Sequence, residues 1–544
     1  MIPELLAPLF PDGRPLCYRT FVNGKLVLTH WTAWLGEAVP GVHTFECHLE
    51  LDPSALGGGG ALVRIRSRLQ VDAELRPLRY RIQAPGQVMT VSVADGKVQA
   101  TLPDGTRASV PWGDARYLIQ TQMPGLEALV VTHATRGGRA TEEVAVRLFL
   151  ADKLTPIPFK LAPAAGEPER TFRSSHEEVI RFDPSGVPVS LAKKSEGVET
   201  LHVDPPPELP DWKDAAFPAQ ERATYQPPPD AHFELRDVTI PGPATPIGAT
   251  LTVPQRGGPG PFPAVLFISG TGRHDRHGLA GEIDIGSHEI LDALSERAGF
   301  VALRYDKRGA GTTRTGPDVL EGGLKPRVAD ALACWDYLTK LPEVDPGRVF
   351  LMGHSEGGNV ALILAARERL PVRGLVLAAA IGRPLDQLLA DQLVEHCKAQ
   401  GRPQEQIDQG LREQEELMAL IRSGREWTMD NVPDKYYGAI HSRSWFVEHF
   451  ANPPDALIAD IGCPVLICQG EKDFQVSATR DAARLDAAAR AAGVDVTCKT
   501  YATLDHLFKP IEGTSTLASY YQKGRHVDPV FIEDLRAWLT ARGS

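Results

Sequence analysis

The chain has 544 residues, 42% of them hydrophobic and 23% charged, a composition that is typical of folded proteins and excludes a disordered or fibrous chain. A chain of this length exceeds the size at which a single hydrophobic core keeps growing, so we expect at least two domains. The net charge of −11 argues against general affinity for nucleic acid or anionic membranes and favours a neutral or apolar small substrate.

The N-terminal segment has no basic region and no long apolar run, so it does not resemble a signal peptide. No segment approaches the roughly 18 consecutive apolar residues of a membrane-spanning helix, so we expect no membrane insertion. The seven cysteines are scattered, odd in number and without paired metal-ligand spacing. They are typical of reduced thiols, and we therefore expect a cytoplasmic protein.

Residues 1–200 alternate apolar and polar side chains with the period of two that indicates β-strands. Asn23-Gly24, Asp95-Gly96 and Asp104-Gly105 interrupt the runs, and such dipeptides favour tight hairpin turns. We predict a curved antiparallel β-domain without a catalytic constellation. Gating of substrate, dimerisation or stabilisation are roles compatible with it, and a homo-oligomer is compatible with the sequence.

Proline-rich stretches at 204–212 and 225–233 favour extended backbone, so we place an inter-domain linker at 201–232. The rest of the chain, 233–544, changes pattern. Apolar runs typical of buried parallel strands lie at 262–269, 299–305, 348–353, 374–380 and 463–470. They alternate with helical stretches at 287–298, 326–340, 356–370 and 477–492.

This alternation predicts a doubly wound, mostly parallel α/β sheet. Residues 384–460 interrupt it with helical sequence and a group of aromatic residues, Trp427, Tyr436, Tyr437, Trp445, Phe446 and Phe450. Because this insertion follows the carboxyl end of a strand, we expect it to form a lid over the site. An extra helical layer away from the site is the alternative.

The segment Gly353-His354-Ser355-Glu356-Gly357 matches G-x-S-x-G between an apolar strand and a helix. In that setting the glycines permit a sharp turn that exposes the serine hydroxyl at the sheet edge. We predict that Ser355 is a nucleophile.

A serine hydroxyl needs a general base and a group that orients the base. Asp473 and His506 each follow a predicted strand, in the order serine, acid, histidine. We predict that His506 is the base and Asp473 its orienting acid. Asp473 could instead cap a helix near Ser477, and His506 could be an exposed loop histidine. The rival carboxylates are Asp505 and Glu471, but Asp505 adjoins the histidine in sequence and points the wrong way to orient its ring.

Acyl transfer also needs amide donors for the oxyanion, usually the residue after the nucleophile and one in the loop after an earlier strand. We predict the amides of Glu356 and Thr271, with Gly272 in reserve. His274, Asp275 and His277 lie in the same loop, but their spacing matches no established metal-ligand pattern, so we expect them to stabilise the loop. We expect no metal and no cofactor. Asp306 and Arg308 are expected to fix a neighbouring loop through hydrogen bonds.

Four motifs, GHSEGG, SGTGRHDR, RYDKRGAG and LDHLFK, resemble those of bacterial serine esterases of the α/β-hydrolase superfamily. The resemblance covers about 233–542 and implies hydrolysis of carboxylic esters, often short-chain, through an acyl-enzyme without a cofactor. Arg273, His274 and Asp505 depart from the family pattern, which leaves the triad intact but puts the acyl-pocket and leaving-group preferences in doubt.

Three other functions stay open on this evidence. A peptidase or amidase uses the same triad, although residues 1–200 show none of the 40–50-residue repeats of a propeller. A thioesterase would need a basic pocket for a coenzyme phosphate, and none stands out. A non-catalytic binding protein on the same fold would normally have lost a triad residue.

Overall fold

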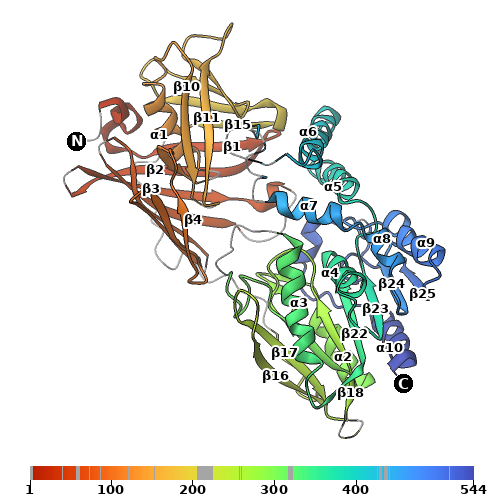
Figure 1. Cartoon of the computed structure of the whole chain (residues 1–544). Coiled ribbons are helices and arrows are strands. Elements are labelled where there is room, and N and C mark those ends of the chain that lie inside the picture. The colour runs from red at the N-terminus through yellow and green to blue at the C-terminus, as the bar shows by residue number, and fades with distance from the viewer. Residues whose placement is uncertain are drawn as a thin grey trace. The chain divides into compact units, whose positions relative to one another are not determined.

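The computed structural model describes most of the chain, namely residues 4–39, 41–56, 62–72, 74–85, 87–120, 123–151, 153–204, 225–256, 258, 260–315, 323–425, 427, 432–433, 436, 439, 442–513 and 515–543. It separates into two compact units (Figure 1). The β-rich unit comprises Met1–Glu221, Gln400–Gly410 and Arg425–Ile440, and the α/β unit comprises Arg222–Ala399, Leu411–Gly424 and His441–Ser544.

The described strands of the β-rich unit form one sheet of fifteen, in the order β8-β7-β6-β5-β4-β3-β2-β1-β15-β14-β13-β12-β11-β10-β9. They are β1 (Leu16–Val22), β2 (Lys25–Val39), β3 (Val42–Leu51), β4 (Val63–Asp72), β5 (Pro77–Ala84), β6 (Gln87–Ala94), β7 (Lys97–Thr101), β8 (Arg107–Pro111), β9 (Tyr117–Ile119), β10 (Val144–Leu150), β11 (Thr155–Pro163), β12 (Thr171–Ser174), β13 (Val179–Phe182), β14 (Pro188–Lys193) and β15 (Val198–His202).

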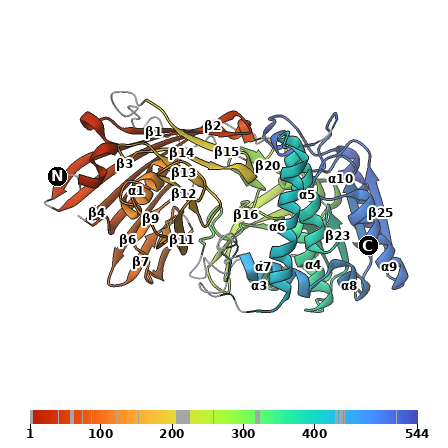
Figure 2. The same ribbon diagram turned by 90° about the horizontal axis from the view of Figure 1, so that it is seen from above.

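Neighbouring strands of this sheet run antiparallel, except that β9 and β10 are parallel. The turns β1–β2 and β6–β7 have positive φ at Asn23, Gly24, Asp95 and Gly96, which is the backbone that the hairpin dipeptides predict. A helix that the sequence pattern does not reveal, α1 (Pro124–Ala134), packs against β1, β2, β9 and β14 (Figure 2).

The α/β unit is built on an eight-stranded sheet in the order β16-β17-β21-β18-β22-β23-β24-β25. From β21 to β25 the pairs are parallel, whereas β16, β17 and β21 pair antiparallel. The strands are β16 (Phe233–Ile240), β17 (Ile247–Pro254), β18 (Phe262–Ile268), β21 (Val301–Tyr305), β22 (Val344–His354), β23 (Gly374–Ala378), β24 (Val465–Gly470) and β25 (Val496–Tyr501); β19 (Leu279–Ala280) and β20 (Ile283–Asp284) form a separate small hairpin.

Both faces of this sheet are covered, since successive residues of β18 enter two different hydrophobic cores. One core holds side chains of α3 (Leu324–Leu338), α4 (Glu356–Ala366), α8 (Pro454–Ala459) and α9 (Ala483–Ala491). The other holds α2 (Ser287–Ala298) and α10 (Pro529–Gly543). The central strands are apolar throughout because neither of their faces meets water.

The remaining described helices follow β23 along the chain: α5 (Leu385–Ala399), α6 (Gln404–Arg422) and α7 (Arg443–Ala451). Short helical turns are η1 (Glu4–Leu9), η2 (Pro11–Gly13), η3 (Pro53–Leu56), η4 (Lys194–Glu196), η7 (Ala478–Ala482) and η8 (Leu517–Tyr521).

The five parallel strands and the four helices expected from the sequence of 262–492 are confirmed, with ends shifted by a few residues. The domain limits 1–200, 201–232 and 233–544, and the lid function of 384–460, stay predictions. Most of the predicted linker, 205–224, lies outside the described residues, as does Tyr437 in the predicted lid.

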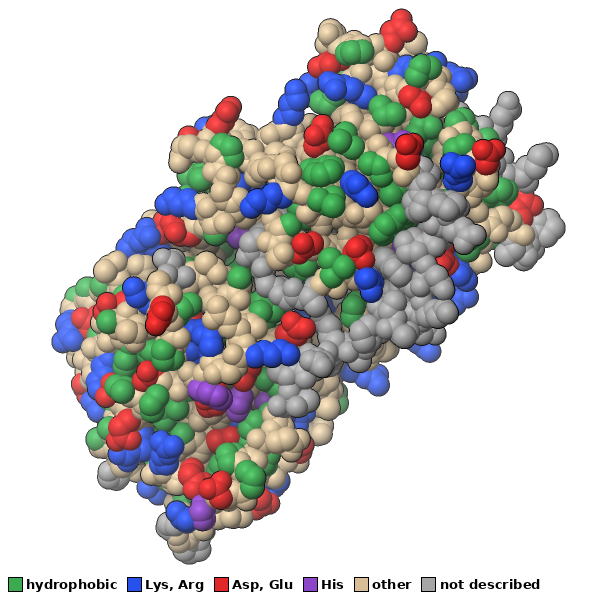
Figure 3. Space-filling model, turned by 180° about the vertical axis from the view of Figure 1, so that it is seen from behind, with side chains coloured by type: hydrophobic (Ala, Val, Ile, Leu, Met, Phe, Trp, Pro, Cys, Tyr) green, Lys and Arg blue, Asp and Glu red, His purple; other side chains and the backbone are tan. Residues whose placement is uncertain are grey.

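Among the described helices, none combines the length and the apolar character needed to cross a bilayer. On the face seen in Figure 3, acidic and basic side chains are interspersed rather than gathered into one large area of a single sign. All seven cysteines are free thiols.

Candidate active site

Ser355 occupies the sharp turn between β22 and α4, with φ 55° and ψ −125°. A left-handed backbone at a residue with a side chain is strained, and the surrounding packing must hold it there. The Ser355 amide donates to the Ala378 carbonyl over 2.9 Å. A Cβ on Gly357 would lie 2.0 Å from the Ile268 carbonyl oxygen, and one on Gly353 2.3 Å from the Gly357 oxygen. Gly357 is therefore required by close packing of the turn against β18, and Gly353 by close packing within the turn.

His506 and Asp473, on the loops after β25 and β24, are hydrogen-bonded through the His506 Nδ1 and the Asp473 Oδ2 atoms, 2.7 Å apart. Both side chains are almost fully buried. His506 is thus not an exposed loop histidine, and its ring is oriented by a carboxylate.

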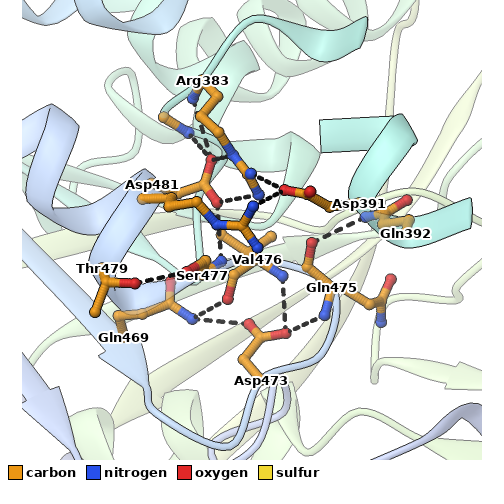
Figure 4. Close-up of polar contacts among 12 residues, drawn as sticks. Arg383, Asp391, Gln392, Gln469, Asp473, Gln475, Val476, Ser477, Thr479 and Asp481 are labelled. Atoms are coloured by element: carbon orange, nitrogen blue, oxygen red, sulfur yellow. Dashed lines mark hydrogen bonds and ion pairs between the residues drawn. The ribbon is translucent and has the colours of Figure 1, made fainter. Parts of the chain in front are cut away.

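Three further donors fix the Asp473 carboxylate (Figure 4). The amides of Gln475 and Val476 donate to Oδ1 over 2.8 and 3.0 Å, and Gln469 Nε2 donates to Oδ2 over 2.8 Å. Asp473 therefore organises its own loop as well as accepting from His506. The buried Asp481 nearby holds the loop after β23 through Arg383.

The two rival carboxylates are engaged elsewhere. Asp505 accepts from the amides of Leu507 and Lys509 over 2.9 and 3.1 Å and from Arg525 over 2.6 Å, so it closes the turn around the histidine. Glu471 is exposed and accepts from the Thr500 hydroxyl. Neither makes a described contact with the His506 ring.

His354 connects the histidine loop to the nucleophile turn. Its Nε2 donates to the His506 carbonyl over 2.9 Å, and the two rings lie with centroids 4.8 Å apart. Burial, reinforced by the charge of His506, lowers the pKa of His354 to about 3, so this ring stays neutral. Since Ser355 follows His354 directly, the contact brings the loop of His506 against the turn that carries Ser355.

The predicted oxyanion loop lies beside the same turn. A Cβ on Gly270 would approach the Ser355 Cβ to 2.8 Å, so this backbone packs closely against Ser355. Within the described part of the chain, no protein acceptor takes the amide hydrogen of either Thr271 or Glu356. Gly272, the reserve donor, is exposed and has φ 110°. The oxyanion role of these amides stays a prediction.

A charged cluster beneath the turn was not foreseen from the sequence, which suggested only a backbone role for Glu356. The Glu356 carboxylate is buried and accepts from Arg327 over 3.0 Å and from Trp445 Nε1 over 2.5 Å. Burial alone would raise the pKa of Glu356, but Arg327 and Lys307 outweigh it and lower that pKa. Lys307 Nζ lies 4.0 Å from Glu356 Oε2 and donates to the Gly270 carbonyl.

Asp275, Asp306 and Arg308 fix the neighbouring loops through hydrogen bonds, as expected. Asp275 accepts from the amides of His277 and Leu279. The buried Asp306 pairs with Arg276, whose Nη2 is 2.7 Å from Asp306 Oδ2. Arg308 forms two hydrogen bonds with Asp330, of 2.7 and 2.9 Å. Burial lowers the pKa of His274 and of His277 to about 4, with contributions from nearby charges.

One group of three side chains in the described residues, Asp284, His288 and Glu289, has its potential ligand atoms within 4.8 Å of one another. It does not include His274, Asp275 or His277. These half-buried groups make other contacts, among them Asp284 with the Gly286 amide and Glu289 with the Val527 amide.

A cavity of about 250 Å³ opens beside the oxyanion loop. Its walls include Ser269 and Gly272 of that loop, Lys307, Arg327 of α3 and Val360 of α4. Of the aromatic residues predicted for a lid, Trp445 on α7 reaches the Glu356 carboxylate, and Phe446 and Phe450 follow it on the same helix.

A family model described as serine aminopeptidase, S33 (Hydrolase_4) matches residues 276–509, a stretch that contains all three predicted triad residues. Esterase EstD of Thermotoga maritima is 28% identical over 307 residues, which are 56% of this chain and 68% of that protein.

Solved structures with similarity to the chain include Est1E and EstE1. Est1E from Butyrivibrio proteoclasticus has 14% identity and a TM-score of 0.33, covering 56% of this chain and 98% of its own. The carboxylesterase EstE1, cloned from a metagenomic library, has 19% identity and a TM-score of 0.36, covering 57% of this chain and 90% of its own. Together, the family model and EstD support the assignment of the α/β-hydrolase superfamily to this part of the chain.

Proposed function

We propose that this chain, as an α/β-hydrolase similar to EstD, is a serine hydrolase that cleaves carboxylic esters through an acyl-enzyme. The observation that carries the proposal is the buried hydrogen bond between Asp473 and His506, beside the strained turn that carries Ser355. A serine, a carboxylate and an imidazole on the loops after β22, β24 and β25 are what acyl transfer requires, and no cofactor enters any step.

His506 takes the proton from the Ser355 hydroxyl as that oxygen attacks the ester carbonyl. The negative charge passes to the carbonyl oxygen, which the amides of Thr271 and Glu356 bind. The tetrahedral intermediate collapses, His506 protonates the departing alcohol, and the acyl group stays on Ser355. Water then attacks the acyl-enzyme while His506 accepts its proton. The second tetrahedral intermediate collapses, His506 returns that proton to the Ser355 oxygen, and the carboxylic acid leaves. Asp473 accepts from His506 Nδ1, orients the ring and stabilises the imidazolium.

The proposed substrate is a small neutral ester. The lid aromatics on α7, with Trp445 already against the nucleophile turn, support an apolar surface for the acyl or alcohol part. The second candidate activity is cleavage of a peptide or amide bond, and the match to the serine aminopeptidase model favours it. The same triad can perform both reactions, so substrate and not geometry separates them.

The test is hydrolysis of p-nitrophenyl acetate, butyrate and octanoate by the wild type and by Ser355→Ala, each checked for folding. We expect kcat to fall by at least about 10³-fold in Ser355→Ala, because the nucleophile is removed. Ser185→Ala, which changes an exposed serine of the β-rich unit, serves as the matched control and should keep full activity.

The proposal fails if Ser355→Ala retains most of the wild-type rate. If the wild type is inactive on all three esters but cleaves aminoacyl p-nitroanilides, the peptidase replaces the esterase. The trend along the three acyl chains gives the size of the acyl pocket.

A further inference from the structure

We propose that Lys307 is a positioning residue of the oxyanion hole. It donates a hydrogen bond to the Gly270 carbonyl and so directs the amide of Thr271 toward the substrate. This inference rests on the proposed serine-hydrolase function and adds to it a side chain that neither contacts the substrate nor belongs to the triad.

One peptide unit connects Lys307 to the amide of Thr271. Lys307 Nζ donates a hydrogen bond to the carbonyl oxygen of Gly270. The peptide group that carries this carbonyl also carries the amide of Thr271, and in a planar trans peptide the C=O and N–H bonds point in opposite directions. Holding the oxygen toward the buried Lys307 therefore directs the N–H away from it, on the side where Thr271 is exposed.

Gly270 has no side chain that could hold its backbone in place. Its Cα packs against Ser355 so closely that a Cβ would come within 2.8 Å of the serine Cβ. A glycine that is followed by the exposed Thr271 and Gly272 has wide conformational freedom. The hydrogen bond from Lys307 removes part of that freedom before substrate arrives, and such preorganisation is what makes an oxyanion hole effective.

The charge of Lys307 also acts on this peptide unit. A hydrogen bond from an ammonium group is stronger than one between neutral partners, and it polarises the peptide that accepts it. Polarisation of the Gly270 carbonyl makes the Thr271 N–H a better donor. Lys307 thus strengthens, as well as orients, an interaction that matters most when negative charge develops on the substrate oxygen.

Lys307 also lies close to Glu356, the residue that carries the second predicted donor. The Glu356 carboxylate lies 4.0 Å from Lys307 Nζ and is also held by Arg327 and Trp445. The amide of Glu356 is the second predicted oxyanion donor. One buried ion cluster therefore connects the two predicted donors, Thr271 and Glu356, which lie 85 residues apart in the sequence.

The protonation of Lys307 depends on the groups that face it. Burial lowers the pKa of Lys307 to about 8; Glu356 on α4 opposes this effect and Arg327 on α3 adds to it. His274, whose carbonyl accepts from the Lys307 amide, is neutral at pH 7 because burial, aided by Lys307, lowers its pKa to about 4. Most of Lys307 is therefore charged at pH 7, and the charge is lost as the pH rises through about 8.

The experiment measures kcat and KM for p-nitrophenyl butyrate in the wild type, Lys307→Met, Lys307→Arg and Ser355→Ala. Removal of one oxyanion-hole donor costs about 10²- to 10³-fold in kcat, so loss of its positioning group should cost about 10- to 100-fold. KM should stay within about twofold, since the contact serves the transition state rather than the bound ester. Lys340→Met, at an exposed lysine after α3, is the matched control and should not alter either constant.

Lys307→Arg supplies a readout that a purely structural role would not move. In the wild type, kcat should decline as the pH rises past about 8, when Lys307 loses its proton. Arginine stays protonated over this range, so the alkaline decline should disappear in Lys307→Arg while most of kcat at pH 7 is restored.

Each outcome decides. If Ser355→Ala keeps its activity, the proposed function and this inference both fall. If Ser355→Ala is inactive but folded Lys307→Met keeps wild-type kcat, or changes only KM, the inference alone is overturned. Should Lys307→Met fail to fold, the Arg variant decides: an alkaline decline equal to that of the wild type contradicts the role of Lys307, and its loss supports it.

Discussion

Asp473 illustrates how much of the chemistry depends on the surroundings of a single carboxylate. It is buried and accepts from His506, Gln469 and two backbone amides. A carboxylate with this many donors keeps its position, and by accepting from Nδ1 it holds the His506 ring in one orientation. The opposite nitrogen is then left to accept the proton of a serine.

Asp473→Asn should lower kcat by roughly 10³- to 10⁴-fold at pH 7 with little loss of stability. The amide has the shape of the carboxylate but can present an N–H to His506, which favours the wrong tautomer of the ring. Steady-state kinetics on p-nitrophenyl butyrate, with a thermal melt of each variant, measures both effects.

Glu471→Gln is the control for this variant, because Glu471 is the exposed rival carboxylate on the same loop. It should leave kcat within about twofold of the wild type. A fall in Glu471→Gln as large as that in Asp473→Asn would show that the acid has been assigned to the wrong residue.

At this scale the sequence predicted the residues that lie in motifs. Ser355, His506 and Asp473 each follow a strand, and the last two are in hydrogen-bond contact in the structure. It did not predict the cluster of Lys307, Arg327 and Glu356, because pairing between side chains from three distant segments leaves no local pattern. Position directly after a strand end, which Lys307 shares with the triad, is the one signal that could have drawn attention to it.

Helix α4 is the element that positions Ser355, the proposed nucleophile. Its residues are apolar on nearly all sides and buried, so it is enclosed rather than amphipathic. Its first turn touches β18 so closely that Gly357 has no room for a side chain. The position of Ser355 is therefore set by contact between two regular elements, which is more rigid than a loop would be.

Gly357→Ala should displace α4 from β18, because the new Cβ would lie 2.0 Å from the Ile268 carbonyl oxygen. We expect a lower melting temperature and a loss of at least about tenfold in kcat/KM, since a shift of about 1 Å near reacting groups can cost 10²-fold. Differential scanning calorimetry and ester hydrolysis give the two values.

Gly347→Ala is the matched change, in the first part of β22, where the added Cβ would meet nothing closer than 3.4 Å. It should be tolerated. If Gly357→Ala were as stable and as active as Gly347→Ala, close contact between α4 and β18 would not be what fixes the serine.

Elements with a strong period were predictable, and those set by tertiary contacts were not. The apolar runs and helical stretches after residue 260 correspond to β18, β21 to β24 and α2 to α4 and α9. In contrast, α1 begins with Pro124 and has almost no polar face, so its sequence lacks a helical period and its helix depends on the sheet around it. The parallel pairing of β9 with β10 likewise follows from the position of α1 between them, which no local pattern encodes.

The stability of the whole molecule includes a half-buried acidic pair in the β-rich unit. Burial raises the pKa of Glu127 on α1 well above its usual value, and the adjacent Glu178 raises it further. A carboxyl with a raised pKa in the folded state is most favourable to folding when protonated. Its contribution is present at acidic pH and is lost as the pH rises through the raised pKa.

Glu127→Gln should therefore increase the free energy of unfolding at pH 8 and change it little at pH 4. The amide keeps the shape of the protonated acid but cannot ionise, so the penalty at high pH disappears. Urea titrations at the two pH values measure the difference, with Glu142→Gln, at an exposed glutamate of the same unit, as the reference. A destabilisation of Glu127→Gln at pH 8 would contradict the assigned direction.

Because β1 pairs with β15, the sheet of the β-rich unit is completed only after β15 has been synthesised. The fifteen-stranded sheet consists of two ribbons, β1 to β8 and β9 to β15, and this one pair of strands is where they join. Within each ribbon most paired strands are neighbours in the sequence. Tyr18 of β1, however, pairs with His202 of β15, which is synthesised much later. During synthesis on the ribosome, the first ribbon can assemble while its seam is still an open edge. That edge stays available to wrong partners until the last strand of the unit emerges.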